Sequence, residues 1–131
     1  MTDQPPKTIL VVEDDAAART ALAAVLLESG YAVAPAQNGR VALDLLAAGL
    51  PAELILLDML MPELDGWHVL GRLRETPHAT VPVVMMTGSV LSREWAAEHG
   101  CAGFLKKPID EAELLVEIGQ VLNPAEQSRS A

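Results

Sequence analysis

The chain of 131 residues is poor in cysteine, in basic residues and in long apolar runs. Its single cysteine, Cys101, excludes an internal disulfide framework and fits a reducing compartment. No apolar stretch approaches the roughly 20 residues that a membrane-spanning helix needs. Residues 1–7 lack the apolar segment of a signal peptide, so we expect a cytoplasmic protein.

Acidic residues outnumber basic residues by 18 to 9, which gives a net charge of −9 at pH 7. Direct binding to nucleic acid is therefore disfavoured, because that binding depends on Lys and Arg side chains that neutralise phosphates. Solubility accounts for most of the negative charge. A surplus of carboxylates also fits a cluster that a cation fills. Half of the chain is hydrophobic, which suits one domain with a sheet covered by helices on both faces.

Apolar runs of strand length alternate with segments of helical periodicity along the chain. The predicted strands are 8–12, 31–36, 54–57, 81–86 and 101–105. The predicted helices are 16–29, a segment around 41–46, a segment from 66 to about 76, a segment within 90–99, and 111–122. This alternation predicts an α/β fold with a doubly wound, five-stranded parallel sheet, in the flavodoxin-like order 2-1-3-4-5. We expect one domain over 8–123, a flexible lead over 1–7 and a disordered tail over 124–131.

The third predicted strand runs directly into Asp58, and Pro62 follows four residues later. A strand buried on both faces releases a charged side chain only at its end. In open α/β sheets, ligands and chemistry collect at the carboxyl ends of the strands. Aspartate also caps helices and begins turns. The stretch alone therefore leaves both interpretations open.

Polar residues also follow the other major strands: Glu13 and Asp14 after the first, Thr87 after the fourth and Lys107 after the fifth. The predicted topology places all of them on the same edge of the sheet as Asp58. Three carboxylates so close together repel, and a divalent cation removes the conflict. Carboxylate, carbonyl and water ligands favour Mg²⁺, with Mn²⁺ as a substitute. An added ammonium and hydroxyl would bind an anion beside the metal, as phosphoryl transfer to a carboxylate requires.

With these residues the sequence resembles the receiver domain of two-component response regulators, of the single-domain type. The matching segments are 9–15 (ILVVEDD), 57–62 (LDMLMP) with Asp65-Gly66, 86–88 (MTG) and 104–108 (FLKKP). The resemblance covers about residues 8–122. It implies a stand-alone regulator whose Asp58 accepts a phosphoryl group from a sensor histidine kinase or a phosphotransfer protein. The signal would leave through the fourth helix, fifth strand and fifth helix, by protein–protein contact or phosphorelay.

The resemblance also implies how the metal is held and how the phosphoryl group is released. Glu13, Asp14 and Asp58 would bind Mg²⁺ together with the main-chain carbonyl of Leu60. Leu60 and Ser89 would flank the path of the attacking water. An apolar Leu60 cannot orient that water, so these two positions are expected to modulate the rate of phosphoryl loss.

Further residues match the family's phosphate contacts and its switch. Thr87 and Lys107 would contact the phosphoryl group, and Thr87 would move together with the aromatic ring of Phe104. A lone phenylalanine on a strand is otherwise a core residue. The bond between Lys107 and Pro108 matches a peptide bond that is cis in this family.

Three other functions stay open. A small Mg²⁺-dependent phosphatase with an aspartyl intermediate is disfavoured, because such enzymes carry a second aspartate where this chain has Leu60. A flavodoxin-like cofactor-binding module is disfavoured because acids, and no glycine-rich loop, follow the first strand. A receiver-like interaction module that is never phosphorylated is disfavoured by the complete residue set. As a receiver, the chain would catalyse only its own phosphorylation and dephosphorylation, as a monomer or a weak phosphorylation-dependent dimer.

Overall fold

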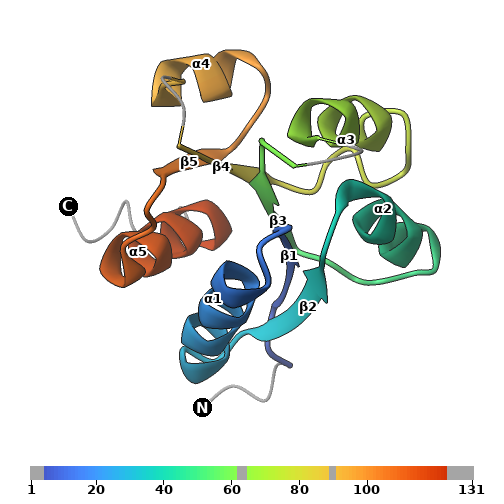
Figure 1. Ribbon diagram of the computed structural model, residues 1–131. Helices are drawn as coiled ribbons and strands as arrows, with labels where there is room; N and C mark the ends of the chain where they lie inside the picture. The colour runs from blue at the N-terminus through green and yellow to red at the C-terminus, as the bar shows by residue number, and fades with distance from the viewer. Residues whose placement is uncertain (1–4, 62–64, 89–90, 124–131) are drawn as a thin grey trace.

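The computed structural model describes residues 5–61, 65–88 and 91–123. Its parallel sheet has the order β2-β1-β3-β4-β5, which confirms the predicted fold. The strands are β1 (Thr8–Val12), β2 (Ala32–Ala36), β3 (Leu54–Asp58), β4 (Val83–Thr87) and β5 (Gly103–Lys106). The helices are α1 (Ala16–Glu28), α2 (Gly39–Ala47), α3 (Gly66–Leu73), α4 (Arg93–Glu98) and α5 (Glu111–Leu122). Helices α1 and α5 cover one face of the sheet, and α2, α3 and α4 lie on the other (Figure 1).

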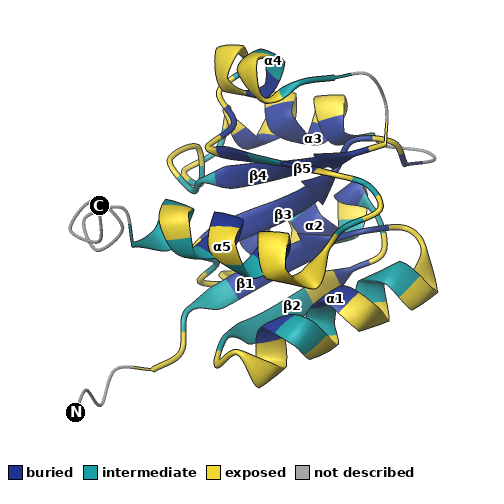
Figure 2. Ribbon diagram, turned by 90° about the vertical axis from the view of Figure 1, so that its left-hand side faces the viewer, coloured by how far each residue is buried: buried dark blue, intermediate teal, exposed yellow. Residues whose placement is uncertain are grey.

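The inner strands contribute side chains to two hydrophobic clusters, one on each face of the sheet. Leu10 and Ile55 pack on the side of α2, α3 and α4, whereas their neighbours Val11 and Leu56 pack against α1 and α5. Successive side chains on a strand point to opposite faces, so a sheet covered on both sides needs apolar residues at consecutive positions. This arrangement explains the continuous apolar runs, and Figure 2 shows the buried strands between partly exposed helices. Among the described residues, no helix is both long and apolar enough to cross a membrane.

Several strand boundaries differ from the prediction, for local reasons. β4 begins at Val83 rather than at residue 81, because Pro82 has no N–H to donate to a neighbouring strand. β5 begins at Gly103 rather than at residue 101, because the Cys101 N–H completes the turn after α4 by donating to Ala96. β2 begins one residue late, since the Tyr31 N–H donates to Leu26 at the end of α1.

Helices α3 and α4 are shorter than predicted, and α1 ends one residue early, at Glu28. α3 ends at Leu73 instead of about residue 76, where the Thr76 hydroxyl donates to the Leu73 carbonyl over 2.7 Å and closes the last turn. α4 fills only part of the 90–99 window and begins after Ser92, whose side chain accepts from the Trp95 N–H. Residue 90, the first four residues of the lead and the tail over 124–131 lie outside the described residues.

The helices that follow the sheet's carboxyl edge begin at side-chain caps. The carboxylates or amides of Asp15, Asn38, Asp65 and Asp110 each accept a hydrogen bond from a main-chain N–H three residues later. Such caps satisfy N–H groups that have no partner inside the helix. These caps fix where the chain turns back from the strand ends.

The outer strands have a different environment from the inner ones. β2 carries the exposed Pro35, opposite Val11 in the register. Main-chain bonds to the β1 side use Ala32 and Ala36, and this alternation leaves Pro35 facing the free edge. At the other edge, the Phe104 N–H of β5 donates to a side chain of α5. The two outer edges of the sheet therefore differ: Pro35 faces solvent at β2, and a hydrogen bond to α5 occupies the Phe104 N–H at β5.

Helix α3 begins in direct contact with the end of β3. A Cβ added at Gly66 would lie 2.6 Å from Met59 Sδ and 2.9 Å from the Asp58 carbonyl oxygen. Gly66→Ala is therefore expected to lower the free energy of unfolding by roughly 1–3 kcal/mol, because the main chain must shift to relieve the overlap. Urea denaturation followed by circular dichroism measures this change.

Gly71 is the matched control in the same helix, since a Cβ there meets nothing within 4 Å. Gly71→Ala should raise the free energy of unfolding by up to about 1 kcal/mol through the higher helix propensity of alanine. Equal effects of the two substitutions would contradict the close packing at Gly66.

Candidate functional site

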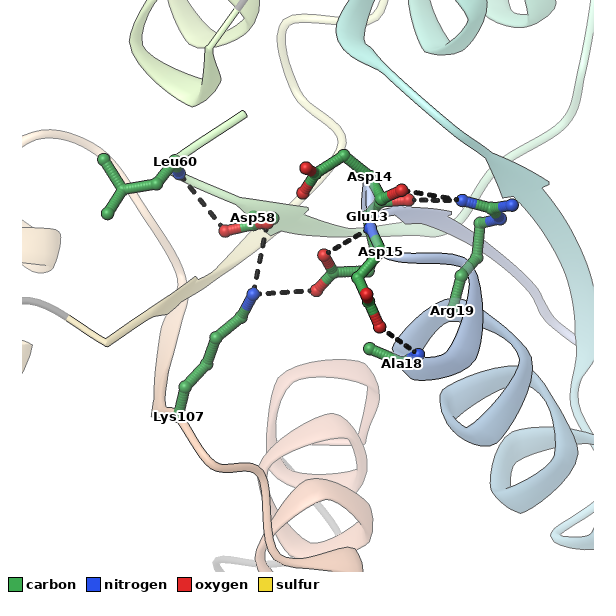
Figure 3. A network of polar contacts seen from close by, with 8 residues as sticks. All are labelled: Glu13, Asp14, Asp15, Ala18, Arg19, Asp58, Leu60 and Lys107. Carbon is green, nitrogen blue, oxygen red and sulfur yellow. Dashed lines mark hydrogen bonds and ion pairs between the residues drawn. The ribbon is translucent and has the colours of Figure 1, made fainter. Parts of the chain in front are cut away.

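Four strands end at one edge of the sheet, and each delivers a polar residue there. Glu13 follows β1, Asp58 ends β3, Thr87 ends β4 and Lys107 follows β5. Carboxylate oxygens of Glu13, Asp14 and Asp58 lie within 4.8 Å of one another. The structure therefore brings together the carboxylates and the lysine that the sequence placed on one edge (Figure 3).

Lys107 bridges the two buried carboxylates of the site. Its Nζ lies 2.9 Å from Glu13 Oε1 and 3.1 Å from Asp58 Oδ2. Both carboxylates are only 1% exposed. The remaining oxygens accept main-chain hydrogen bonds, Asp58 Oδ1 from the Leu60 N–H at 3.2 Å and Glu13 Oε2 from the Asp15 N–H at 3.1 Å. Both acids are therefore held in place from two sides.

The loop that carries the acidic pair is fixed by an arginine that the sequence analysis missed. Arg19 of α1 donates through Nη1 to the carbonyl oxygens of Glu13 and Asp14, at 2.8 and 3.4 Å (Figure 3). These contacts involve main-chain atoms, so no pattern of side-chain types reveals them. Asp14 itself is exposed, which leaves its carboxylate accessible from solvent.

The structure describes the other predicted site residues except Ser89. Thr87 is buried, and its carbonyl accepts the Lys107 N–H at 2.9 Å. The bond between Lys107 and Pro108 is cis. Phe104 is half-buried and packs on the side of α4, while the Leu60 side chain is 65% exposed. Ser89 lies outside the described residues.

Burial and crowding change the proton affinity of the site. Desolvation, reinforced by the Glu13 carboxylate, raises the pKa of Asp58 to about 7, although the Leu60 N–H and Lys107 act in the opposite direction. Burial by itself lowers the pKa of Lys107, but the contacts with Glu13 and Asp58 outweigh it and the net shift is upward. The lysine thus stays cationic, while Asp58 carries a proton over much of the acidic range.

The donor set fits a divalent cation. Glu13 Oε1 and Asp58 Oδ2 are buried, and within the described part of the chain the single positive charge of Lys107 is shared between the two carboxylates. Asp14 adds a third carboxylate from the solvent side. Hard oxygen ligands with one open side are typical of Mg²⁺ sites.

A second polar cluster lies between α4, β5 and α5, and the sequence analysis did not identify it. Its centre is Glu117, which is only 6% exposed and pairs with Arg93 at 2.7 Å. A signal for it exists in the sequence, because Glu117 stands three residues after Leu114 and one before Ile118. The side chains of Leu114 and Ile118 are both buried in the core. Glu117 therefore lies on the buried face of α5.

Comparison with known proteins assigns the class. The sequence model of the response regulator receiver domain family matches residues 9–119, so the chain belongs to this family of signalling modules. Response regulator MprA of Mycolicibacterium vanbaalenii is 40% identical over 119 residues, which is 89% of this chain and 51% of MprA. The chain therefore spans about half the length of that relative.

Solved structures agree with this assignment. Chemotaxis protein CheY4 of Vibrio cholerae has a TM-score of 0.81 at 27% identity, over 89% of this chain and 99% of that one. The receiver domain of a histidine kinase from Syntrophus aciditrophicus has a TM-score of 0.79 at 32% identity, over 90% and 91% of the two chains. The family resemblance in the sequence is thereby confirmed.

The raised pKa of Asp58 makes folding stability depend on pH. Between pH 3.8 and about 7, the folded protein keeps a proton on Asp58 that the unfolded chain releases. Stability in metal-free buffer therefore falls as the pH rises through this window. Asp58→Asn removes the titrating group, so the stability of this variant should not fall in the same way. The unfolding free energy of the variant minus that of the wild type should therefore be larger at about pH 8 than at about pH 5, by roughly 1–3 kcal/mol.

Chemical denaturation in the presence of a chelator measures this difference. Asp44→Asn changes an exposed aspartate of α2 and should give the same small effect at both values of pH. A gain from Asp58→Asn that does not grow with pH would show that Asp58 ionises normally in the folded protein.

Proposed function

We propose that this receiver domain is a phosphorylation-dependent switch that accepts a phosphoryl group on Asp58 from the phosphohistidine of a sensor kinase or phosphotransfer protein. The observation that carries the proposal is the position of Asp58 at the end of β3, buried and paired with Lys107 beside two further acids. The class of the relatives supports it, since MprA is a response regulator.

The transfer requires Asp58 as the nucleophile. One of its carboxylate oxygens forms a bond to phosphorus, while the bond from phosphorus to the donor's imidazole nitrogen breaks and the imidazole leaves with the electron pair. Glu13, Asp14, Asp58 and the Leu60 carbonyl would hold Mg²⁺, or Mn²⁺ in its place, which supplies charge neutralisation at the phosphoryl oxygens. The Lys107 ammonium, already within 3.1 Å of Asp58, pairs with the phosphoryl group.

Phosphorylation is then communicated to the surface of α4, β5 and α5. The modification adds about two negative charges at the carboxyl edge of the sheet. The Thr87 hydroxyl turns to donate to a phosphoryl oxygen, and Phe104 moves inward on the neighbouring strand. Since a modification can only bias states that already exist, the switch is a shift in their populations. The partner downstream is a protein that reads this surface, or the next member of a phosphorelay.

Further properties of the proposal follow the family. The receiver domain occupies residues 8–123, works in the cytoplasm without direct contact to nucleic acid, and is a monomer or a weak dimer when phosphorylated. Its chemistry is confined to its own phosphorylation and dephosphorylation. A phosphatase acting on other molecules is the second candidate, and the exposed apolar Leu60 near Asp58 argues against it.

A phosphorylated Asp58 is directly testable by intact-protein mass spectrometry. With acetyl phosphate and Mg²⁺, the wild type should gain the mass of one phosphoryl group, whereas Asp58→Asn should gain none. Asp14→Asn should slow formation of the adduct at least tenfold, because about 1.4 kcal/mol of lost charge neutralisation gives that factor. Asp44→Asn is the matched control and should react at the wild-type rate. An adduct that persists in Asp58→Asn would contradict the assignment.

The side chain of Leu60 sets the lifetime of the aspartyl phosphate. Leu60→Asn is expected to speed phosphoryl loss roughly tenfold, equivalent to about 1.4 kcal/mol, because an amide can orient the attacking water and a leucine cannot. Decay of the adduct after removal of the donor measures the rate. Leu27→Asn replaces another exposed leucine, on α1, and should leave the rate unchanged. Unchanged or slower decay in Leu60→Asn would refute this role.

A further inference from the structure

The cluster around Glu117 joins three separate elements. Arg93 at the start of α4 donates through Nη1 to Glu117 Oε2 at 2.7 Å and through Nη2 to Oε1 at 3.1 Å. The same Oε2 accepts the Phe104 N–H at 3.0 Å. Arg93 Nη2 also donates to the Phe104 carbonyl at 3.3 Å. The two side chains, from α4 and α5, therefore hold both main-chain groups of one β5 residue.

The position of the carboxylate depends on a glycine in β5. A Cβ added at Gly103 would lie 2.6 Å from Glu117 Oε2 and 3.1 Å from a methyl group of Val84. Any larger residue at this position would displace the carboxylate from the strand. The free edge of β5 is thus shaped to receive the side chain of Glu117.

The ion pair joins an exposed arginine to a buried glutamate, with side-chain exposed fractions of 60% and 8%. Glu117 is 6% exposed, so its charge is largely removed from water and needs a partner. Although burial alone raises it, the hydrogen bonds from Arg93 and Phe104 bring the pKa of Glu117 below its ordinary value. The bidentate geometry adds direction to the attraction. Separation of the pair would leave an uncompensated buried carboxylate.

The cluster is linked to the phosphorylation site through a short piece of chain. Phe104 stands three residues before Lys107, whose ammonium contacts Glu13 and Asp58. The Lys107 N–H is fixed to the Thr87 carbonyl at the end of β4. A movement of α4 or of the Phe104 main chain would therefore strain either the Arg93–Glu117 pair or the strand that carries Lys107.

We infer that Arg93, Glu117 and the main chain of Phe104 form a latch that holds α4 and β5 in the unphosphorylated arrangement. The inference rests on the proposed function, because it assigns an opposing element to the proposed switch. Neither Arg93 nor Glu117 forms a hydrogen bond or ion pair with the acids of the phosphorylation site or with Lys107. They therefore act as positioning residues. The latch must open or rearrange before α4 and the main chain of β5 around Phe104 can shift, and it raises the stimulus needed for switching.

Opening the latch by mutation should therefore make the active state easier to reach. Beryllium fluoride with Mg²⁺ serves as a phosphoryl analogue. Intrinsic fluorescence is the readout, because the rings of Trp67 in α3 and Trp95 in α4 contact each other with their centroids 4.3 Å apart. Arg93→Gln is expected to reach half-saturation at a roughly 3- to 10-fold lower concentration of beryllium fluoride, because less differential binding energy is needed to shift the two states. The rate of phosphorylation by acetyl phosphate should rise by a similar factor.

Two further variants separate a latch from a structural contact. The double variant Arg93→Gln/Glu117→Gln removes both charges, keeps an acceptor for the Phe104 N–H and avoids an unpaired buried carboxylate, so it should fold and show the same increase in affinity. Arg93→Lys keeps the charge but not the bidentate geometry, and its affinity should lie between those of the wild type and Arg93→Gln. Arg72→Gln, an exposed arginine in the last turn of α3, should behave as the wild type.

The outcomes distinguish the latch from the proposed function. A wild-type protein that binds neither beryllium fluoride nor a phosphoryl group refutes the proposed function and the latch together. A wild type that responds, with folded Arg93 and double variants of equal or lower affinity, overturns the latch alone. Thermal melting of each variant identifies the folded samples on which this comparison is made.

Discussion

The attraction between one ammonium and two buried carboxylates is the constraint on which the rest of the structure depends. Glu13 and Asp58 end neighbouring parallel strands, so the sheet itself forces their charges together. Lys107 relieves this repulsion only because β5 ends at the same edge. The arrangement leaves the site balanced for one charge state and ready to respond when a cation or a phosphoryl group changes it. Burial makes that response large, because few water molecules screen it.

Much of the fold and of the site could be predicted from sequence, because both depend on where apolar runs end. Asp58, Thr87 and Lys107 each follow an apolar run, and parallel topology then places them at one edge. Strand and helix boundaries were less predictable, since they depend on individual hydrogen bonds such as that from Thr76 to Leu73. The roles assigned to the site residues stay predictions.

The pair of Arg93 and Glu117 escaped prediction for a different reason. The two residues are far apart in sequence, and their contact exists only once α4 and α5 flank β5. Only the spacing of Glu117 relative to the buried face of its helix hints at burial. The parallel pairing of the strands does not depend on this contact, so the fold does not require it. A latch at this position would set a threshold for activation without altering the shared fold.

The terminations of the sheet have a consequence for how the protein behaves at high concentration. A free strand edge is a template on which another chain can pair and begin to aggregate. At β2, Pro35 faces that edge and has no N–H to offer a neighbouring strand. At β5, the main-chain groups of Phe104 are already occupied by side chains of its own flanking helices. Both outer strands are thus protected from pairing with another chain. β2 lacks a donor at Pro35, and at β5 the side chains of Arg93 and Glu117 occupy the main-chain groups that a further strand would bind.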